Sequence, residues 1–174
     1  MTRHDTIIDI TYSYYLEKMQ STLCGRIDRF LSFLTLFLGA AIFADFHGTI
    51  IYGGIIAIIA SLNTVYRFGK ESELSHQRAQ HYLLLKRNKE SLSDEQLNNE
   101  LKNLEKDDGF IFSVLCNAAQ QRSTIVLGLR DNPAIKLTTF EKIISWLAGN
   151  LPNQSEYLAN NTGPYPLSET ESNN

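Results

Sequence analysis

The sequence predicts an all-α membrane protein, made of a two-span transmembrane helical hairpin, a helical cytoplasmic domain and a disordered C-terminal tail. Three observations predict this fold class. Two apolar stretches, residues 27–46 and 49–68, follow each other with only a short connection between them. The segments before and after this pair place apolar side chains at helical spacing, and no segment alternates as a strand does. From Pro152 onward the chain has few large apolar residues, so it cannot bury enough surface to offset the cost of ordering.

Each apolar stretch is long enough to cross a bilayer. A helix rises about 1.5 Å per residue, so some 20 residues cross a hydrocarbon core of about 30 Å. The segments 30–44 and 49–65 contain no Asp, Glu, Lys or Arg, whereas the core helices of soluble proteins carry a polar face. We therefore expect a membrane hairpin over residues 27–68. A buried helical hairpin in a soluble domain is the alternative.

Basic residues flank the outer ends of the two spans. Arg26 and Arg29 precede the first span, and Arg67 and Lys70 follow the second. The connection at 45–48 contains neither Lys nor Arg. Because Lys and Arg stay on the cytoplasmic side of a membrane, we expect both termini in the cytoplasm and the short turn outside.

The rest of the chain divides into three predicted parts. Residues 1–26 form an amphipathic cytoplasmic helix, residues 69–150 a helical cytoplasmic domain and residues 151–174 a flexible tail. The helical spacing of the first part is carried by Ile8, Tyr12, Tyr15, Leu16, Met19 and Leu23. Because the segment 67–89 contains no Pro, we expect the second span to continue into the cytoplasm as one long rod.

Capping residues predict three further cytoplasmic helices. Ser93 is the expected N-cap of the first of these helices. The second is expected to begin after residues 107–109 and to close at Gly128. Thr139 is the expected N-cap of the third. Trp146 lies off the apolar stripe of that last helix, which leaves it for a membrane-interface anchor or a subunit contact.

Signals of catalysis are missing from the sequence. The four histidines are scattered, and His76 and His81 are five residues apart, so they do not share a helix face as a pair of metal ligands would. There is no glycine-rich phosphate loop, nucleophile elbow or CxxC pair. We therefore expect no enzyme activity, no cofactor and no metal. Both cysteines fall on the predicted cytoplasmic side, where we expect them to stay reduced.

Polar and small residues mark one line along each span. Those of the first span recur at intervals of three and four residues, so they share a helix face that could border water. The candidate pore-lining residues are Asp28, Ser32, Thr35, Gly39, Asp45 and Asn63. The candidate helix-packing residues are Gly53, Ala57 and Ser61. Ordinary helix association explains such stripes as well, and a salt bridge with Arg26 or Arg29 is the alternative role for Asp28.

Within a single hairpin, the two spans can pack against each other through only one of these two faces. The other face implies neighbouring subunits or a pore, so we expect a homo-oligomer, with a tetramer as the guess from the small hairpin. A single two-span protomer cannot enclose a water-filled path, whereas several protomers around an axis can. Rings of Asp28 and Asp45 at the two mouths would then favour cations.

Basic residues recur along the predicted cytoplasmic helices. Assembled in a ring, they could bind a nucleotide or a short single-stranded nucleic acid. The candidates are Arg67, Lys70, Arg78, Lys86, Arg87, Arg122 and Arg130. Solvated helix faces and contacts with anionic lipid headgroups are the alternatives for such charges.

The whole order of segments resembles the SLATT family of bacterial two-span proteins, over residues 6–150. The resemblance is carried by the tight hairpin, the basic helix after it and the late Trp146 helix. It is also carried by Thr11-Tyr12-Ser13-Tyr14-Tyr15, Tyr66-Arg67-Phe68, Leu104-Glu105-Lys106-Asp107-Asp108 and Val114-Leu115-Cys116-Asn117.

This resemblance implies an effector of antiphage defence in the bacterial inner membrane, such as the channel subunit of a Hailong-like or CBASS-like system. Such an effector depolarises the membrane when infection changes a nucleotide signal made by a nucleotidyltransferase encoded nearby. Two other functions fit the same sequence. One is a prophage protein that excludes superinfecting phage, and the other is a non-conducting membrane anchor for a partner enzyme.

Overall fold

The structure is a computed structural model that describes residues 2–43, 49–107, 109–129 and 135–152. These residues form α-helices and two short 3-10 turns, and no strand occurs among them. The predicted all-helical class is therefore confirmed for the described part. Its elements are α1 (Arg3–Phe43), α2 (Thr49–Tyr66), α3 (Phe68–Asn88), η1 (Lys89–Ser91), α4 (Asp94–Glu105), η2 (Ser113–Leu115), α5 (Cys116–Leu127) and α6 (Thr139–Leu147).

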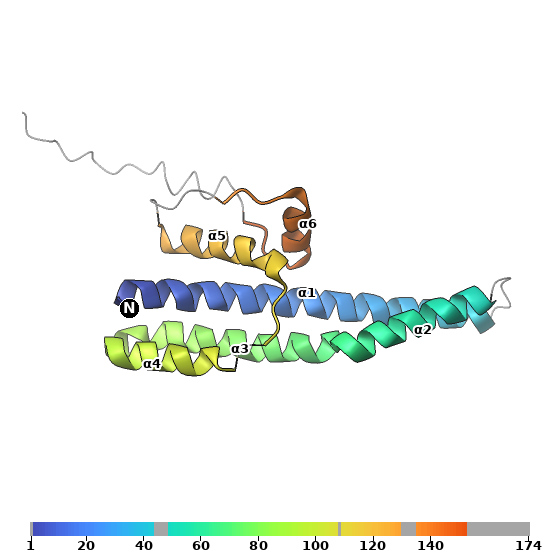
Figure 1. Cartoon of the computed structure of the whole chain (residues 1–174), viewed down its shortest axis with the longest axis horizontal. Helices are drawn as coiled ribbons and strands as arrows, with labels where there is room; N and C mark the ends of the chain where they lie inside the picture. Colours follow the sequence, from blue (N-terminus) through green and yellow to red (C-terminus); the bar gives the residue numbers. More distant parts are fainter. Residues whose placement is uncertain (1, 44–48, 108, 130–134, 153–174) are drawn as a thin grey trace, which may run out of the picture.

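The long helix α1 organises the whole molecule. Figure 1 shows α3 beside the N-terminal half of α1 and α2 beside its C-terminal half. The predicted lead-in helix and the helical part of the first predicted span are therefore one continuous helix of 41 residues. Nothing in the sequence around residues 26 and 27 breaks it, because this part of the chain contains no Pro.

We predicted that the second span continues into the following helix as one rod. This prediction is wrong in one respect, because α2 and α3 are separated at Arg67. This residue has a φ of 48° and a ψ of 47°, which is the left-handed region. Backbone hydrogen bonds continue on both sides of it, from Arg67 N to Asn63 O at 2.9 Å and from Glu71 N to Arg67 O at 3.0 Å. A left-handed residue other than Gly costs about 1–2 kcal/mol, so the surrounding contacts must hold this one in place.

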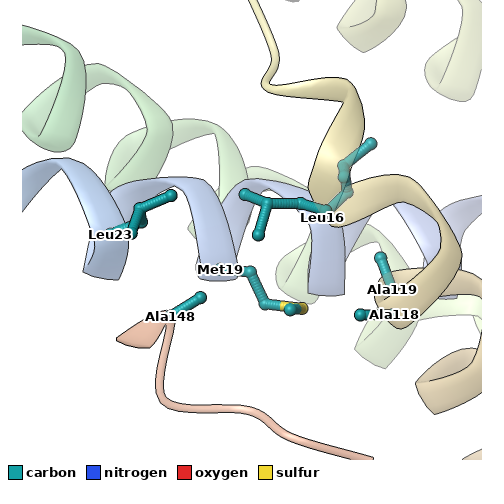
Figure 2. Close-up of a cluster of buried hydrophobic side chains, with 7 residues drawn as sticks. Leu16, Met19, Leu23, Ala118, Ala119 and Ala148 are labelled. Carbon is teal, nitrogen blue, oxygen red and sulfur yellow. The ribbon is translucent and has the colours of Figure 1, made fainter. Parts of the chain in front are cut away.

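Two apolar clusters hold the other helices to the N-terminal half of α1. The first joins α1 to α5 and to the residue that follows α6, and Figure 2 shows Met19 extending from α1 toward Ala118. The second joins α1 to α3 and α4. The buried members of the first are Leu16, Met19, Leu23, Leu115, Ala118, Ala119 and Ala148. Those of the second are Ile10, Tyr82, Leu85, Leu97 and Leu101.

The expected helix ends are confirmed in α4 and shifted in α6. Ser93 caps α4 and forms a capping box with Gln96. The cap of α6 is Thr138, one residue before the expected Thr139, because Thr138 exchanges hydrogen bonds with Glu141. Gly128 closes α5 with a φ of 65°, as expected.

The helix expected directly after residues 107–109 begins later, at Cys116. The preceding residues run over α1 instead, and Gln20 holds their backbone. Its Nε2 donates to Phe110 O at 3.2 Å, and its Oε1 accepts from Phe112 N at 3.2 Å. These bonds replace the helical ladder over this segment, so the helix starts only after the crossing.

Small residues of α1 and α3 face each other at one point of the contact between these helices. Ser21 Oγ donates to Ser72 O and Ser72 Oγ donates to Ser21 O, each at 2.8 Å. One turn along α1, a Cβ added at Gly25 would lie 2.9 Å from Ser72 Oγ. The absence of a side chain at Gly25 therefore permits this pair of hydrogen bonds.

Replacement of this glycine should weaken the contact between α1 and α3. We expect Gly25→Ala to lower the free energy of unfolding by about 1–2 kcal/mol, because the methyl group displaces the Ser72 hydroxyl from its bond to Ser21. Gly54→Ala is the matched control, since a Cβ there meets nothing within 4 Å and alanine favours a helix. Thermal unfolding in detergent measures both. Equal midpoints for the two variants would contradict the expected close contact.

Candidate functional site

A polar groove lies between α1 and α2, near the junction of α2 with α3. It is an open cavity of about 1000 Å³. Its lining includes the apolar side chains of Leu36, Ile59 and Ala60, and polar side chains from both helices and from the start of α3. The polar side chains are Asp28, Ser32 and Thr35 of α1, Asn63 and Thr64 of α2, and Arg67 and Lys70 at the junction. The groove therefore brings four of the six candidate pore-lining residues together with two of the candidate ligand-binding residues.

Helical spacing explains why these side chains meet. Asp28, Ser32 and Thr35 lie on one line of α1. The two helices also contact each other, and their buried apolar side chains are Leu38 of α1 and Ile59 of α2, which borders the groove. The polar lines of the two helices therefore face a cavity beside this contact.

The two threonine hydroxyl groups of the groove are satisfied within their own helices. Thr35 Oγ1 donates to Leu31 O, and Thr64 Oγ1 donates to Ala60 O, each at 2.8 Å. Such bonds to the preceding turn let a hydroxyl lie in an apolar helix without another partner. The oxygen lone pairs remain as acceptors, so these groups can solvate a water molecule or a cation.

The Asp28 carboxylate lies against the first turn of α3. A Cβ added at Gly69 would lie 3.1 Å from Asp28 Oδ1, so only glycine fits without displacing the carboxylate. The N-terminal end of a helix carries partial positive charge, which favours a carboxylate there. The ion pairs within the described residues do not include Asp28. The alternative salt bridge with Arg26 or Arg29 is therefore not formed in this structure.

The remaining candidates of the two spans lie outside the groove. Gly39 is not among its lining residues, and Asp45 falls outside the described residues. The small residues Gly53, Ala57 and Ser61 lie on an exposed face of α2. A Cβ added at Gly53 meets nothing within 4 Å. The small face of α2 is therefore not used against α1.

Large apolar side chains cover the outside of the α1–α2 pair. We call these ten exposed residues the apolar belt. They are Phe30, Phe33, Leu36, Phe37, Ile50, Ile51, Ile55, Ile58, Leu62 and Val65. In the part of the chain that the structure describes, one helical stretch, Ile50–Ser91, is long and apolar enough to cross a membrane. Only 6% of the apolar 18-residue segment within it is buried.

The structure does not bring the basic candidates together as one ligand site. Arg67 and Lys70 line the polar groove, whereas Lys86 and Arg87 lie in the last turn of α3. These pairs are some 16 residues or about 24 Å apart along the chain. Arg122 of α5 lies over the ring of Tyr15, 5.9 Å from its centroid. Two candidates remain: Arg78, which is partly buried, and Arg130, which falls outside the described residues.

Arg78 is part of a buried cluster of charges that the sequence did not predict. Its Nη1 lies 3.1 Å from Glu71 Oε1 and 3.5 Å from Glu17 Oε2. The side chain of Glu17 is only 1% exposed. Burial lowers the pKa of Arg78, but its hydrogen bond to Glu71 and the charge of Glu17 outweigh burial and raise it overall. A buried charge is costly unless it is paired, so Arg78 neutralises Glu17 and does not serve as a surface ligand.

Cys24 lies beside this cluster, three residues after Ser21 on α1. Its side chain is fully buried. Burial, together with the charges of Glu71 and Glu17, raises the pKa of the Cys24 thiol to about 11. The thiol therefore stays protonated near neutral pH and acts as a small apolar group.

The sequence carried one signal of this buried cluster. Ile10, Glu17 and Cys24 recur every seven residues along α1, so the carboxylate lies on a stripe that begins and ends with buried residues. Its partner Arg78 lies far along the chain on another helix, and no local pattern pairs the two.

Comparison with known proteins gives no relative, since no family model, curated protein or solved structure matches the chain.

Removal of Arg78 should destabilise the fold much more than removal of an exposed arginine. We expect Arg78→Met to cost about 3–5 kcal/mol, because it leaves the Glu17 carboxylate buried without its cation. Arg87→Met is the matched control on the exposed side of the same helix and should cost less than about 0.5 kcal/mol. Thermal unfolding in detergent distinguishes them. A double variant with Glu17→Gln should recover part of the loss, and no recovery would argue against the ion pair.

Proposed function

We propose that this protein is the subunit of a homo-oligomeric ion channel whose pore is formed by α2 and the C-terminal part of α1. The observation that carries the proposal is the combination of the apolar belt outside this helix pair with the polar groove between its helices. A membrane protein that conducts ions needs both surfaces, one toward lipid and one toward water.

The apolar belt supports insertion into a bilayer. Burial of one Leu, Ile or Phe side chain is worth about 1.5–3 kcal/mol. Ten such residues left largely in water would cost an amount similar to the whole stability of a domain, about 5–15 kcal/mol. A soluble monomer rarely exposes so large a patch, whereas lipid covers it without cost.

Assembly of several copies follows from the shape of one copy. The polar groove is open, so a single protomer cannot close a water-filled path. The small face at Gly53, Ala57 and Ser61 is free within the protomer. Small residues let transmembrane helices approach closely, so this face suits the contact with a neighbouring copy. We therefore propose that neighbouring hairpins complete the pore.

The charges of the groove suggest its orientation and selectivity. Arg67 and Lys70 lie at the same end of the groove as Asp28, and basic residues favour the cytoplasmic side. A ring of Asp28 carboxylates at this inner mouth would attract cations. The neighbouring ring of Arg67 and Lys70 would attract an anionic ligand such as a nucleotide or a short single-stranded nucleic acid.

A bound nucleotide would change the electric field at the mouth and thereby the ion current. The resemblance to SLATT proteins supports a role in antiphage defence, in which a nucleotidyltransferase makes this signal and the channel depolarises the inner membrane. A non-conducting anchor or a superinfection-exclusion protein would share the hairpin but would not need the polar groove.

Current through a planar bilayer that contains the purified protein tests channel function. We expect discrete conductance steps that favour cations. Asp28→Asn should lower the cation conductance several-fold, because it removes negative charge from the mouth. Asp107→Asn removes the same charge from the exposed segment after α4 and should leave the current unchanged. A silent bilayer with correctly inserted oligomer would favour the anchor or the superinfection-exclusion protein.

Addition of cyclic and short linear oligonucleotides to the same bilayers tests the ligand. We expect one class to open or block the current, and the combined change of Arg67→Gln and Lys70→Gln to abolish this response. Arg87→Gln is the control, because Arg87 lies at the far end of α3. If the response persists after the combined change at Arg67 and Lys70 but is lost in Arg87→Gln, the ligand binds outside the groove.

A further inference from the structure

Helix α6 lies across α1 at the level where the charged part of α1 ends. Arg26 Nη1 donates to Leu147 O at 2.8 Å and to Trp146 O at 3.3 Å, so it caps the C-terminal end of α6. Phe30, the first residue of the apolar belt, follows Arg26 by a single helical turn. Figure 1 shows α6 running across the direction of α1, whereas α5 lies along it.

A close approach fixes α6 in this position. Gly149 has a φ of 72°, and a Cβ added there would lie 3.3 Å from Thr22 Cγ2 of α1. Glu141, the one acidic residue of α6, is bound on the other side. It accepts a hydrogen bond from Asn117 Nδ2 of α5 at 2.6 Å and bonds with Thr138. The helix is therefore held at both ends and cannot turn its outer face inward.

The outer face of α6 is apolar although no part of the described chain covers it. Phe140 and Trp146 are each 65% exposed, and Ile143 is 53% exposed. These residues are spaced by three, so Trp146 shares a side of the helix with Phe140 and Ile143, and the expectation that it lies off their stripe is wrong.

Ile144 and Leu147 of the expected stripe pack inward instead. The opposite side packs against the protein through the buried residues Ser145 and Ala148. A helix that packs on one side gains nothing in water from large apolar groups on the other.

Basic residues lie beside this apolar face and at the near end of the apolar belt. Lys136 and Lys142 are exposed beside it, and Arg29 and Lys70 are exposed at the same end of the apolar belt. Lys and Arg near a membrane surface attract anionic lipids. A tryptophan with apolar and basic neighbours is the composition of a helix that lies in a membrane interface.

We infer that α6 is an interfacial helix that binds an anionic lipid surface through Phe140, Ile143 and Trp146. The inference rests on the proposed insertion of the α1–α2 pair, because the same bilayer that covers the apolar belt reaches α6 one helical turn away. Binding of α6 fixes the cytoplasmic helices at a set height and tilt against the membrane. The occupant of this face is lipid and not another copy of the chain.

Fluorescence of Trp146 in vesicles tests this contact, because it is the only tryptophan in the chain. The full-length protein is reconstituted into vesicles of phosphatidylcholine and phosphatidylglycerol, with or without lipids brominated high on the acyl chain. An interfacial helix buries its apolar face about 5–10 Å into the headgroup boundary, so bromine should lower the emission about two-fold. Phe140→Ser with Ile143→Ser should weaken this quenching, and both side chains are exposed enough to change without loss of the fold. Leu84→Ser, on the exposed side of α3, is the control and should leave the quenching unchanged.

The outcomes separate this inference from the proposed function. Resistance to alkaline extraction from the vesicles shows whether the hairpin is inserted, independently of α6. With an inserted hairpin, emission that bromine does not quench overturns the inference. Open access of acrylamide would then mean a helix in water, and protection from acrylamide would mean a contact between subunits. A hairpin that does not insert would overturn both the inference on α6 and the proposed channel function.

Discussion

The contact between α3 and the N-terminal half of α1 is the constraint on which the rest of the structure depends. Its centre is polar, with Arg78 between two carboxylates and a pair of serines that exchange hydrogen bonds. Such groups are satisfied in one register only. A slip of α3 by one turn, about 5.4 Å, would separate Arg78 from Glu17 and leave a buried charge without its partner. The polar contact therefore fixes where α3 begins, and with it the point from which α2 departs.

The polar groove is a consequence of that fixed starting point. The first turn of α3 lies over Asp28. The left-handed backbone conformation of Arg67 then turns the axis of α2 away from the axis of α3. The helix α2 still contacts α1, and Ile59, at the edge of the groove, is its buried apolar side chain. Space between the two helices remains nearest the junction, and this is where the polar side chains lie. The same contacts that hold α3 against α1 thus shape the cavity that we propose as part of the pore.

Local patterns predicted most of the helices and a large part of the groove. Apolar spacing and capping residues predicted α4 to within a residue of its start and α6 one residue late, because the adjacent threonines at 138 and 139 offer the same hydroxyl. The line Asp28, Ser32 and Thr35 was visible because one helix carries it.

Features that join distant parts of the chain could not be predicted in this way. The Arg78 cluster, the crossing of the 110–112 segment and the break at Arg67 depend on partners that are distant in sequence. Seven basic residues suggested a single site, yet those that the structure describes are spread over α3, α5 and the junction between α2 and α3. The number of basic residues in a sequence does not show whether a given arginine faces solvent or pairs with a buried glutamate.

The unbroken course of α1 gives the molecule a mechanical property. A helix of 41 residues is a stiff rod about 60 Å long. The helix α3 packs against its N-terminal half. Arg3 ties its first turn to the α3–α4 connection, with Nη2 donating to Lys89 O at 2.5 Å and Nη1 to Leu92 O at 3.2 Å. The break at Arg67 makes α2 a poor transmitter of rotation from α3, whereas α1 transmits it directly. The rod is therefore a lever, and a small tilt at its N-terminal end displaces its far end in the opposite direction.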